Sequence, residues 1–107
     1  MSHVTTHVLD TARGHPAAGI PVRLDARDDG WSTIATAATD DDGRVRELGP
    51  ESLPAGVYRL VFDTESYLGG DCFLPEVTVT FRITDPAAHY HVPVLLSPFS
   101  YSTYRGS

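Results

Sequence analysis

The pattern that most constrains the fold is an alternation of apolar and polar residues over residues 76–84. In an extended segment, apolar side chains at every second position lie on one face, and the polar side chains between them lie on the other. Comparable runs recur along the chain, and none of them keeps the 3.6-residue period of a helix. They predict eight strands, over residues 3–9, 20–26, 31–39, 45–48, 57–63, 76–84, 89–96 and 99–104.

Turn-forming residues separate these runs, among them Arg13–Pro16, Asp28–Gly30 and Asp40–Gly43. A helix is indicated only for the short stretch 64–68. Short strands punctuated by turns are typical of an antiparallel β-sandwich, so we expect an all-β chain of two packed sheets. The chain has 107 residues, of which 41% are hydrophobic, which predicts a single domain over residues 1–107.

The composition excludes several classes of protein. All eight basic residues are arginines, so chemistry that needs a lysine is excluded. The net charge of −6 argues against binding to nucleic acid. The only cysteine, Cys72, allows neither an internal disulfide nor a metal site of paired cysteines. Because the chain begins without a secretory signal and contains no run of membrane-spanning length, we expect a soluble, cytoplasmic protein with no membrane partner.

The C-terminal segment Tyr101–Ser107 is unusual because chain ends are commonly featureless. Two tyrosines, three hydroxyl residues and an arginine are crowded into it, and a glycine precedes the last residue. The Ser97-Pro98 turn predicts a hairpin between this segment and the strand that contains His89 and His91. We therefore expect the imidazoles to lie beside the tail.

The alternation also predicts that the first and seventh strands each have one face that carries both polar and apolar residues. In the seventh, Tyr90 and every second residue after it belong to the core, while the opposite face carries His89, His91, Pro93 and Leu95. The corresponding set in the first strand is His3, Thr5, His7 and Leu9. Imidazoles, hydroxyls and apolar residues on one outward face suggest that another subunit covers it and that a cleft lies between subunits.

Three segments resemble one family: residues 5–10, then Thr39–Arg44 with its Asp-Gly-Arg, and then residues 89–107 with His-Tyr-His-Val-Pro and Tyr-Arg-Gly-Ser. Over its whole length the chain resembles the 5-hydroxyisourate hydrolases, the transthyretin-related enzymes of urate degradation. The resemblance implies a transthyretin-like sandwich of two four-stranded sheets. It also implies a homotetramer, a dimer of dimers with active sites in a central channel. The implied reaction converts 5-hydroxyisourate to 2-oxo-4-hydroxy-4-carboxy-5-ureidoimidazoline without a cofactor.

Carried over residue by residue, the resemblance implies that the catalytic residues are His7, Arg44 and His91. It implies that the substrate-binding residues come from the tail: Tyr104, Arg105, Gly106 and Ser107. The residue types suit the reaction, because histidine, with an ordinary pKa of about 6.5, can take a proton from water near neutral pH. An arginine can stabilise the oxyanion that then develops. Which histidine is the base stays open, and the stretch 67–75 is shorter than in many family members, which leaves subunit packing there open.

The remaining polar residues receive no role at this point. His3 and His15 are assigned to structure, and so is His89, although it shares a face with His91. Asp40–Asp42 is interpreted as a solvated turn, because the other positions of a calcium loop are absent. His7 and His91 could form part of a zinc site, but no third ligand is evident, so no metal is expected.

Two other classes of function remain possible. A transthyretin-like carrier would hold a ligand in the same channel without chemistry, and a structural β-sandwich module would have no ligand at all. Such modules are usually embedded in longer chains, whereas this chain is expected to be complete from Met1 to its terminal motif. The two histidines and the Tyr-Arg-Gly-Ser end favour the enzyme, and an assay with 5-hydroxyisourate separates the classes.

Overall fold

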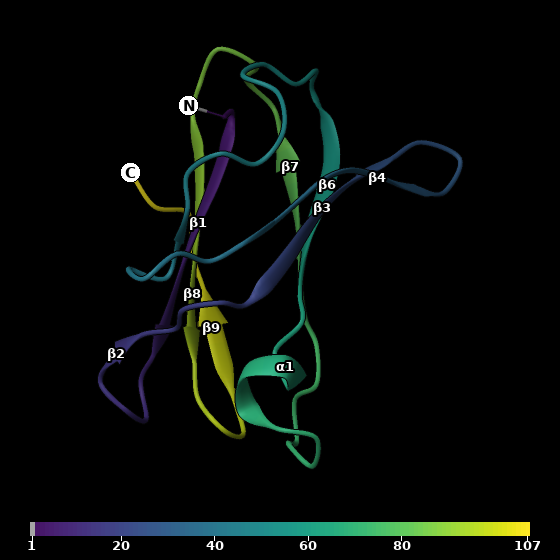
Figure 1. The fold of residues 1–107 in the computed structure, drawn as a ribbon. Helices are drawn as coiled ribbons and strands as arrows, with labels where there is room; N and C mark the ends of the chain where they lie inside the picture. The colour runs from purple at the N-terminus through teal and green to yellow at the C-terminus, as the bar shows by residue number, and fades with distance from the viewer. Residues whose placement is uncertain (1) are drawn as a thin grey trace.

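The computed structural model describes residues 2–107 and shows the strands expected from the alternating pattern (Figure 1). Met1, which the domain prediction includes, lies outside the described residues. The elements are β1 (Val4–Asp10), β2 (His15–Pro16), β3 (Pro21–Arg27), β4 (Trp31–Ala38), β5 (Arg44–Val45), β6 (Gly56–Phe62), α1 (Glu65–Leu68), β7 (Val77–Ile83), β8 (Tyr90–Leu96) and β9 (Tyr101–Thr103).

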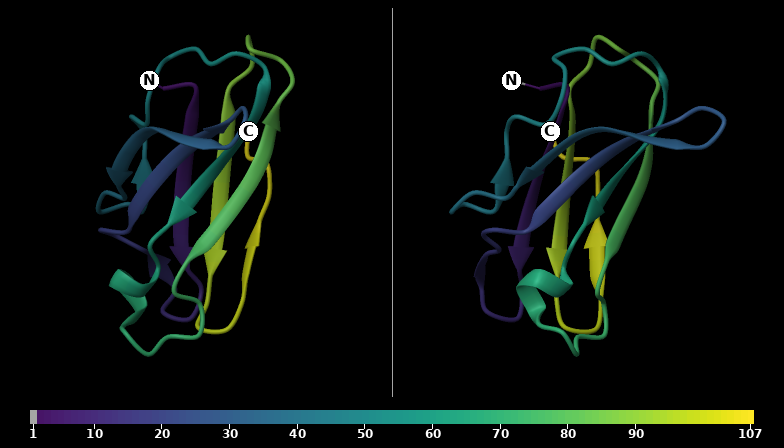
Figure 2. Two further views of the ribbon diagram at one scale, coloured as in Figure 1. Left: turned by 90° about the vertical axis from the view of Figure 1, so that its right-hand side faces the viewer. Right: turned by 45° about the vertical axis from the view of Figure 1, so that its right-hand side comes forward.

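The strands form two sheets that face each other as the layers of a sandwich (Figure 2). One sheet has the order β2-β1-β8-β9, with β5 also paired to β1, and the other has the order β4-β3-β6-β7. In the first sheet β1 and β8 run parallel over seven residue pairs, from Val4 opposite Tyr90 to Asp10 opposite Leu96. The β-sandwich predicted from the sequence is confirmed.

The number of strands differs from the prediction. Over residues 2–107 the structure has nine strands rather than eight, and the first sheet has five strands rather than four. The additional strand is β2, whose residues His15 and Pro16 pair with Asp10 and Leu9. The sequence predicted a turn there because Gly14 and Pro16 are turn formers, and a two-residue ladder leaves no alternating pattern to detect. The hydrogen-bonded strands β5 and β9 are also shorter than the predicted runs 45–48 and 99–104.

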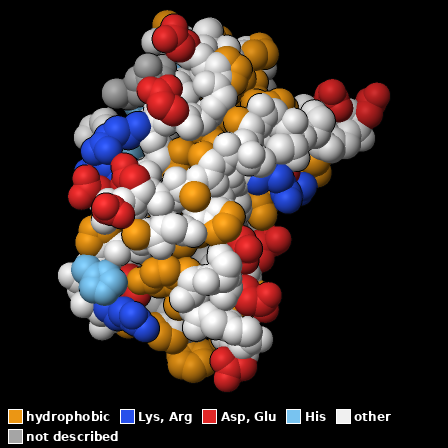
Figure 3. Space-filling view, in the orientation of Figure 1, with side chains coloured by type: hydrophobic (Ala, Val, Ile, Leu, Met, Phe, Trp, Pro, Cys, Tyr) orange, Lys and Arg blue, Asp and Glu red, His pale blue; other side chains and the backbone are white. Residues whose placement is uncertain are grey.

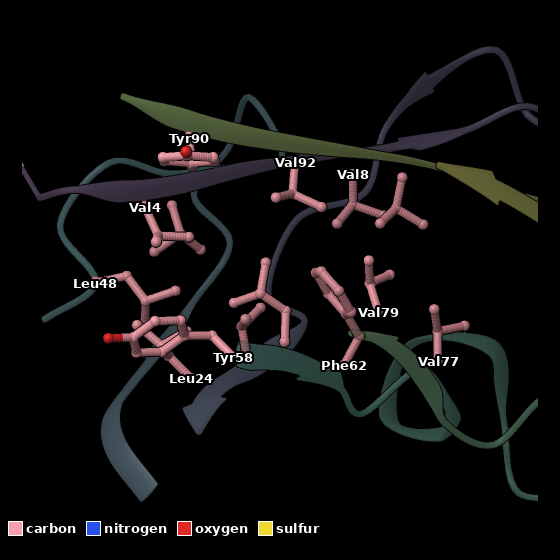
Figure 4. Close-up of a cluster of buried hydrophobic side chains, with 14 of the residues drawn as sticks. Val4, Val8, Leu24, Leu48, Tyr58, Phe62, Val77, Val79, Tyr90 and Val92 are labelled. Carbon is pink, nitrogen blue, oxygen red and sulfur yellow. The ribbon is translucent and has the colours of Figure 1, made fainter. Parts of the chain in front are cut away.

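The core lies between the two sheets, where side chains from both layers meet (Figure 4). In β8, Tyr90 and Leu96 are 4% and 0% exposed, as the alternation predicts. The opposite face is more covered than expected, because Thr5 and Pro93 are already buried within the single chain. Leu9 and Leu95, which are paired across β1 and β8, are only half-buried. These two leucines are therefore the apolar residues of this face that a second subunit could still cover.

The short helix α1 is fastened to the first sheet by a hydrogen bond. The hydroxyl of Tyr67 donates to Oδ2 of Asp10 at 2.7 Å. Burial and the bond to this carboxylate raise the pKa of Tyr67 to about 12. Burial alone would raise the pKa of Asp10, but hydrogen bonds from Tyr67, Arg13 and Ala12 outweigh it and lower the pKa. Asp10 is therefore ionised at neutral pH and holds the helix in place.

The surface is mixed in charge. On the face shown in Figure 3, arginine side chains lie next to acidic ones and do not form a separate basic patch. Among residues 2–107, no helix is long and apolar enough to cross a membrane.

Gly43 is the position where the fold most requires a glycine. Its φ is +75°, and a Cβ atom there would overlap the carbonyl oxygen of Val8 and lie 3.0 Å from Cβ of Pro16. We expect Gly43→Ala to lower the free energy of unfolding by about 2–3 kcal/mol, measured by urea denaturation. The matched control is Gly14→Ala, because Gly14 has a φ of +74° with nothing within 4 Å of its Cβ position. If both variants lose the same stability, the close approach to Val8 is not what requires the glycine.

Candidate active site

Residues from four parts of the chain meet at a cleft of about 250 Å³ on the outer side of the first sheet. Three of the residues assigned from the sequence border it: Arg44 from β5, His91 from β8 and Ser107 from the tail. The other lining residues are Thr5, Thr6, Val45, Arg46 and His89. The pairing of β1 with both β5 and β8 brings these parts together.

His91 is suited to act as a base in this cleft. It is on the outward face of β8, and its Nδ1 lies 2.8 Å from Oγ1 of Thr5, which leaves Nε2 for a substrate or water. Burial lowers the pKa of His91 below its ordinary 6.5, and the positive charge of Arg44 lowers it further. An interaction with the backbone of Thr5 acts in the opposite direction but does not cancel these effects. The ring is therefore neutral at pH 7 and able to accept a proton.

Arg44 forms no close ion pair with the neighbouring acidic turn, although its charge helps to lower the pKa of Asp40. Asp40 and Asp42 instead face Arg46, whose guanidinium nitrogens lie 3.0 Å and 3.9 Å from their carboxylates. Within the described chain, Arg44 has no acidic partner closer than 4.0 Å. The backbone N–H groups of Asp42 and Arg44 donate to Oδ1 of Asp40 at 2.9 Å and fix the turn. Arg44 can thus offer its donors to an anionic ligand at the cleft.

His7 lies beside Arg44 without bordering the cleft itself. The two residues are paired between β1 and β5. The Nε2–H of His7 donates to the carbonyl oxygen of Asp42 at 2.8 Å, so that Nδ1 is its remaining nitrogen. This bond ties the acidic turn to β1.

The tail reaches the site through its backbone. The N–H of Gly106 donates to the carbonyl oxygen of His91 at 2.8 Å, which continues the β8–β9 ladder to the cleft. A Cβ atom on Gly106 would lie 2.6 Å from Cδ2 of His91 and 3.2 Å from Cγ of Pro93. Only a glycine allows the tail to pass this close to the imidazole, and Ser107 follows directly at the edge of the cleft.

The structure places the other two tail residues differently. Tyr104 and Arg105 border another hollow of about 310 Å³, which also includes Val79 and Phe81 of β7. The guanidinium of Arg105 stacks 4.2 Å above the ring of Tyr90 and donates to the carbonyl oxygen of His89 at 3.3 Å. That Tyr104 and Arg105 touch the substrate stays a prediction.

Among the other histidines, His3 is structural, as assigned. It is 4% exposed; its Nδ1 accepts from the N–H of Leu53 at 2.8 Å, and its Nε2 donates to the carbonyl oxygen of Ala88 at 2.6 Å. His15 is exposed and lies in β2. His89, by contrast, borders the cleft, and its Nε2 lies 2.8 Å from Oγ1 of Thr5.

The alternating pattern places Thr5 on the outward face of the first strand, but no role at the site was predicted for it. Its spacing of two residues from His7 places both on one face of β1, and β1 lies beside the strand of His91. The pairing could not be read from the sequence, because parallel neighbours in a sheet leave no local signal.

A larger hollow of about 610 Å³ lies near α1 and the β8–β9 turn, with Cys72, Phe73 and Phe99 among its lining. No histidine borders it, so Cys72 has no imidazole beside it to act as a base. Among residues 2–107, no three histidine, cysteine or acidic side chains are grouped so that they could hold a metal ion.

Comparison with known proteins places the chain among proteins of one kind. A family model described as "HIUase/Transthyretin family" matches residues 4–106. A curated 5-hydroxyisourate hydrolase of Mus musculus is 48% identical over 113 residues, which cover 99% of this chain and 96% of that protein.

Two solved structures share the fold. The 5-hydroxyisourate hydrolase of Klebsiella pneumoniae has a TM-score of 0.84 and 36% identity, with 97% of this chain and 98% of that chain covered. A transthyretin from Sparus aurata has a TM-score of 0.90 and 34% identity, with 99% and 97% covered. The fold alone therefore does not separate a hydrolase from a transthyretin, and the residues at the cleft must do so.

Proposed function

Because the chain belongs to the HIUase/transthyretin family, we propose that it is an enzyme that hydrolyses 5-hydroxyisourate in urate degradation. The identity to curated hydrolases over nearly the whole chain supports this function. The observation that carries it is the meeting of a neutral imidazole, His91, with the guanidinium of Arg44 at one cleft. We further propose that residues 1–107 form one hydrolase domain.

The first step uses His91 as the general base. Its Nε2 takes a proton from a water molecule, whose oxygen attacks the amide-like carbonyl carbon of the oxidised purine ring. A positioned base of this kind contributes about 10²–10⁴-fold to a rate. His91 is preferred over His7 because it borders the cleft and because its lowered pKa keeps it unprotonated at pH 7.

The second requirement is a cation for the oxyanion that forms on the attacked carbonyl. Arg44 supplies it, and its planar donors also suit an anionic purine acid. The ring bond between carbon and nitrogen then breaks, and the leaving nitrogen takes the proton held by His91. Ser107 lies at the edge of the cleft, so its hydroxyl can contact the substrate.

A carrier function like that of transthyretin is less consistent with this site. A carrier needs a complementary surface but no base, whereas the cleft holds an arginine and two imidazoles around one threonine. The deciding experiment follows the ultraviolet absorbance of freshly generated 5-hydroxyisourate with and without the protein. Accelerated decay is the expected result, and decay at the spontaneous rate would exclude the hydrolase.

The pH dependence of turnover should report the lowered pKa of His91. We expect activity to fall on acidification with a midpoint below pH 6.5, because the imidazole must be neutral to act as a base. The measurement is kcat/KM against pH. A midpoint above 6.5 would contradict the assignment of His91.

The same shift affects stability. The native state resists protonation of His91 more than the unfolded chain does, so His91 stabilises the fold above about pH 6.5 and loses this contribution as the pH falls through its folded value. His91→Asn should therefore show a weaker loss of stability on acidification than the unmodified protein.

We also propose that the protein is a cytoplasmic homotetramer, a dimer of dimers in which the outward face of β1 and β8 meets a second subunit. The half-buried Leu9 and Leu95 on this face support an interface. Closure by a second subunit would cover the cleft and exclude water from it.

Leu95→Arg should dissociate this assembly, because an unpartnered charge in an interface costs several kcal/mol. Light scattering at micromolar concentration measures the effect. The control is Thr80→Arg, since Thr80 is exposed on β7 in the other sheet. A monomeric unmodified protein, or a Leu95→Arg tetramer, would contradict the proposed interface.

A further inference from the structure

One hydroxyl group links two of the imidazoles at the cleft. Oγ1 of Thr5 lies 2.8 Å from Nε2 of His89 and 2.8 Å from Nδ1 of His91. Thr5 is 6% exposed, so water competes little for its hydroxyl, whereas His89 is exposed. The backbone of His89 also accepts a hydrogen bond, because the side chain of Arg105 donates to its carbonyl oxygen.

A threonine hydroxyl has a single hydrogen and two lone pairs. If it accepted from both neutral rings, the hydrogen of the buried Thr5 hydroxyl would have no acceptor among residues 2–107, so it donates to one ring and accepts from the other. Two arrangements are possible. In the first, Nδ1–H of His91 donates to Thr5, and Thr5 donates to Nε2 of His89. In the second, every hydrogen bond is reversed, and His91 carries its hydrogen on Nε2. Only the first leaves Nε2 of His91 with a lone pair.

The surrounding charges select the first arrangement. Arg44 borders the same cleft as His91, and its positive charge acts on the ring. A cation is attracted to a lone pair and repelled by the positive end of an N–H bond, so the side of the ring toward the cleft favours an unprotonated nitrogen. The exposed Nδ1 of His89 can carry its hydrogen in water without a further partner.

We propose that Thr5 and His89 are positioning residues, which hold His91 in the tautomer with hydrogen on Nδ1 and a free lone pair on Nε2. This role rests on the proposed function, because it supplies the nitrogen that takes the proton from water. It also gives a reason for both histidines of the His-Tyr-His motif: one is the base, and the other keeps the base in the correct tautomer through Thr5.

The tautomer can be measured without substrate. Long-range proton–nitrogen NMR spectra of protein with ¹⁵N-labelled histidine, recorded above about pH 7.5 so that the rings are neutral, distinguish Nδ1–H from Nε2–H. We expect the spectrum of His91 to show hydrogen on Nδ1. In Thr5→Val, which has the same shape without the hydroxyl, we expect a shift towards the tautomer with hydrogen on Nε2.

The turnover rate should fall in those variants in which the tautomer of His91 changes. Thr5→Val should lower kcat by about 10–100-fold, the usual effect of removing a group that orients a functional histidine, with little change in KM. Thr5→Ser keeps the hydroxyl and should keep most of the activity. His89→Leu removes the acceptor at an exposed position, so it should fold normally and reproduce the effect of Thr5→Val. The matched control is Thr80→Val on β7, which should leave both tautomer and turnover unchanged.

Two results would overturn the positioning role: hydrogen on Nε2 of His91 in the unmodified protein, or an unaltered tautomer in both Thr5→Val and His89→Leu. Failure of the proposed function has a different signature. In that case the unmodified protein does not accelerate the decay of 5-hydroxyisourate, while its NMR spectrum still shows hydrogen on Nδ1 of His91.

Discussion

His91→Asn should fold normally and hydrolyse 5-hydroxyisourate about 10²–10⁴-fold more slowly than the unmodified protein. Asparagine fits the half-buried site on β8 but cannot take a proton from water. Circular dichroism and thermal unfolding establish folding, and the ultraviolet assay gives the rate. The control is His15→Asn, which changes an exposed histidine of β2 and should retain full activity. Near-normal turnover by folded His91→Asn would remove this residue from the mechanism.

The other two assigned residues extend this prediction. Arg44→Ala should raise the barrier by about 2.7–4 kcal/mol, because it removes the donor for the oxyanion. Arg82→Ala on β7 is its control, since that arginine is exposed in the other sheet. His7→Asn should also be nearly inactive if His7 takes part in the reaction. His7 lies beside the cleft and not in its lining, so this variant is the strongest test of whether His7 belongs to the catalytic residues.

Deletion of Arg105, Gly106 and Ser107 should abolish most of the activity while the protein stays folded. These residues place a hydroxyl at the cleft and run past the imidazole of His91, and misplacing a reacting group by about 1 Å can cost on the order of 10²-fold. The stacking of Arg105 on Tyr90 is an exposed cation–π contact worth about 0.5–1 kcal/mol, so the melting temperature should fall by only a few degrees.

Gly106→Ala also tests whether activity depends on the position of the tail, because it adds only one carbon atom. The added Cβ would lie 2.6 Å from the His91 ring, so the imidazole or the tail must move, and turnover should fall although no functional group is lost. A truncated protein with full turnover would remove the tail from the site. A truncated protein that unfolds would instead make the tail a structural latch.

Much of the sandwich could be predicted, because its strands follow a period of two that is local in the sequence. The core face of β8 and the hairpin of β8 with β9 are both present as expected. The strand β2 was missed because two residues have no periodicity. The positions of Tyr104 and Arg105 were not predictable, since regular strand β9 ends at Thr103 and alternation gives no guide beyond it.

At the site, the resemblance to the hydrolase family identified the candidate residues, and the structure showed which of them lie next to one another. The sequence indicated a solvated turn at Asp40–Asp42 and could not show that Arg46, rather than Arg44, forms the close ion pairs with Asp40 and Asp42. That Thr5 joins His89 to His91 depends on which strands are neighbours, and neighbours far apart in the chain are not encoded in any local pattern.

The parallel ladder between β1 and β8 also dictates when the site can exist during synthesis. Val4 pairs with Tyr90, so nearly the whole chain must be made before the centre of the first sheet can close. At about 5–20 residues per second, β1 waits on the order of ten seconds for β8, with only the short strands β2 and β5 available to pair with it earlier. Contacts between segments so far apart in the sequence also form slowly after the chain is released from the ribosome. Catalytic competence should therefore appear late and all at once, and a chain halted before residue 90 would contain His7 and Arg44 but no cleft.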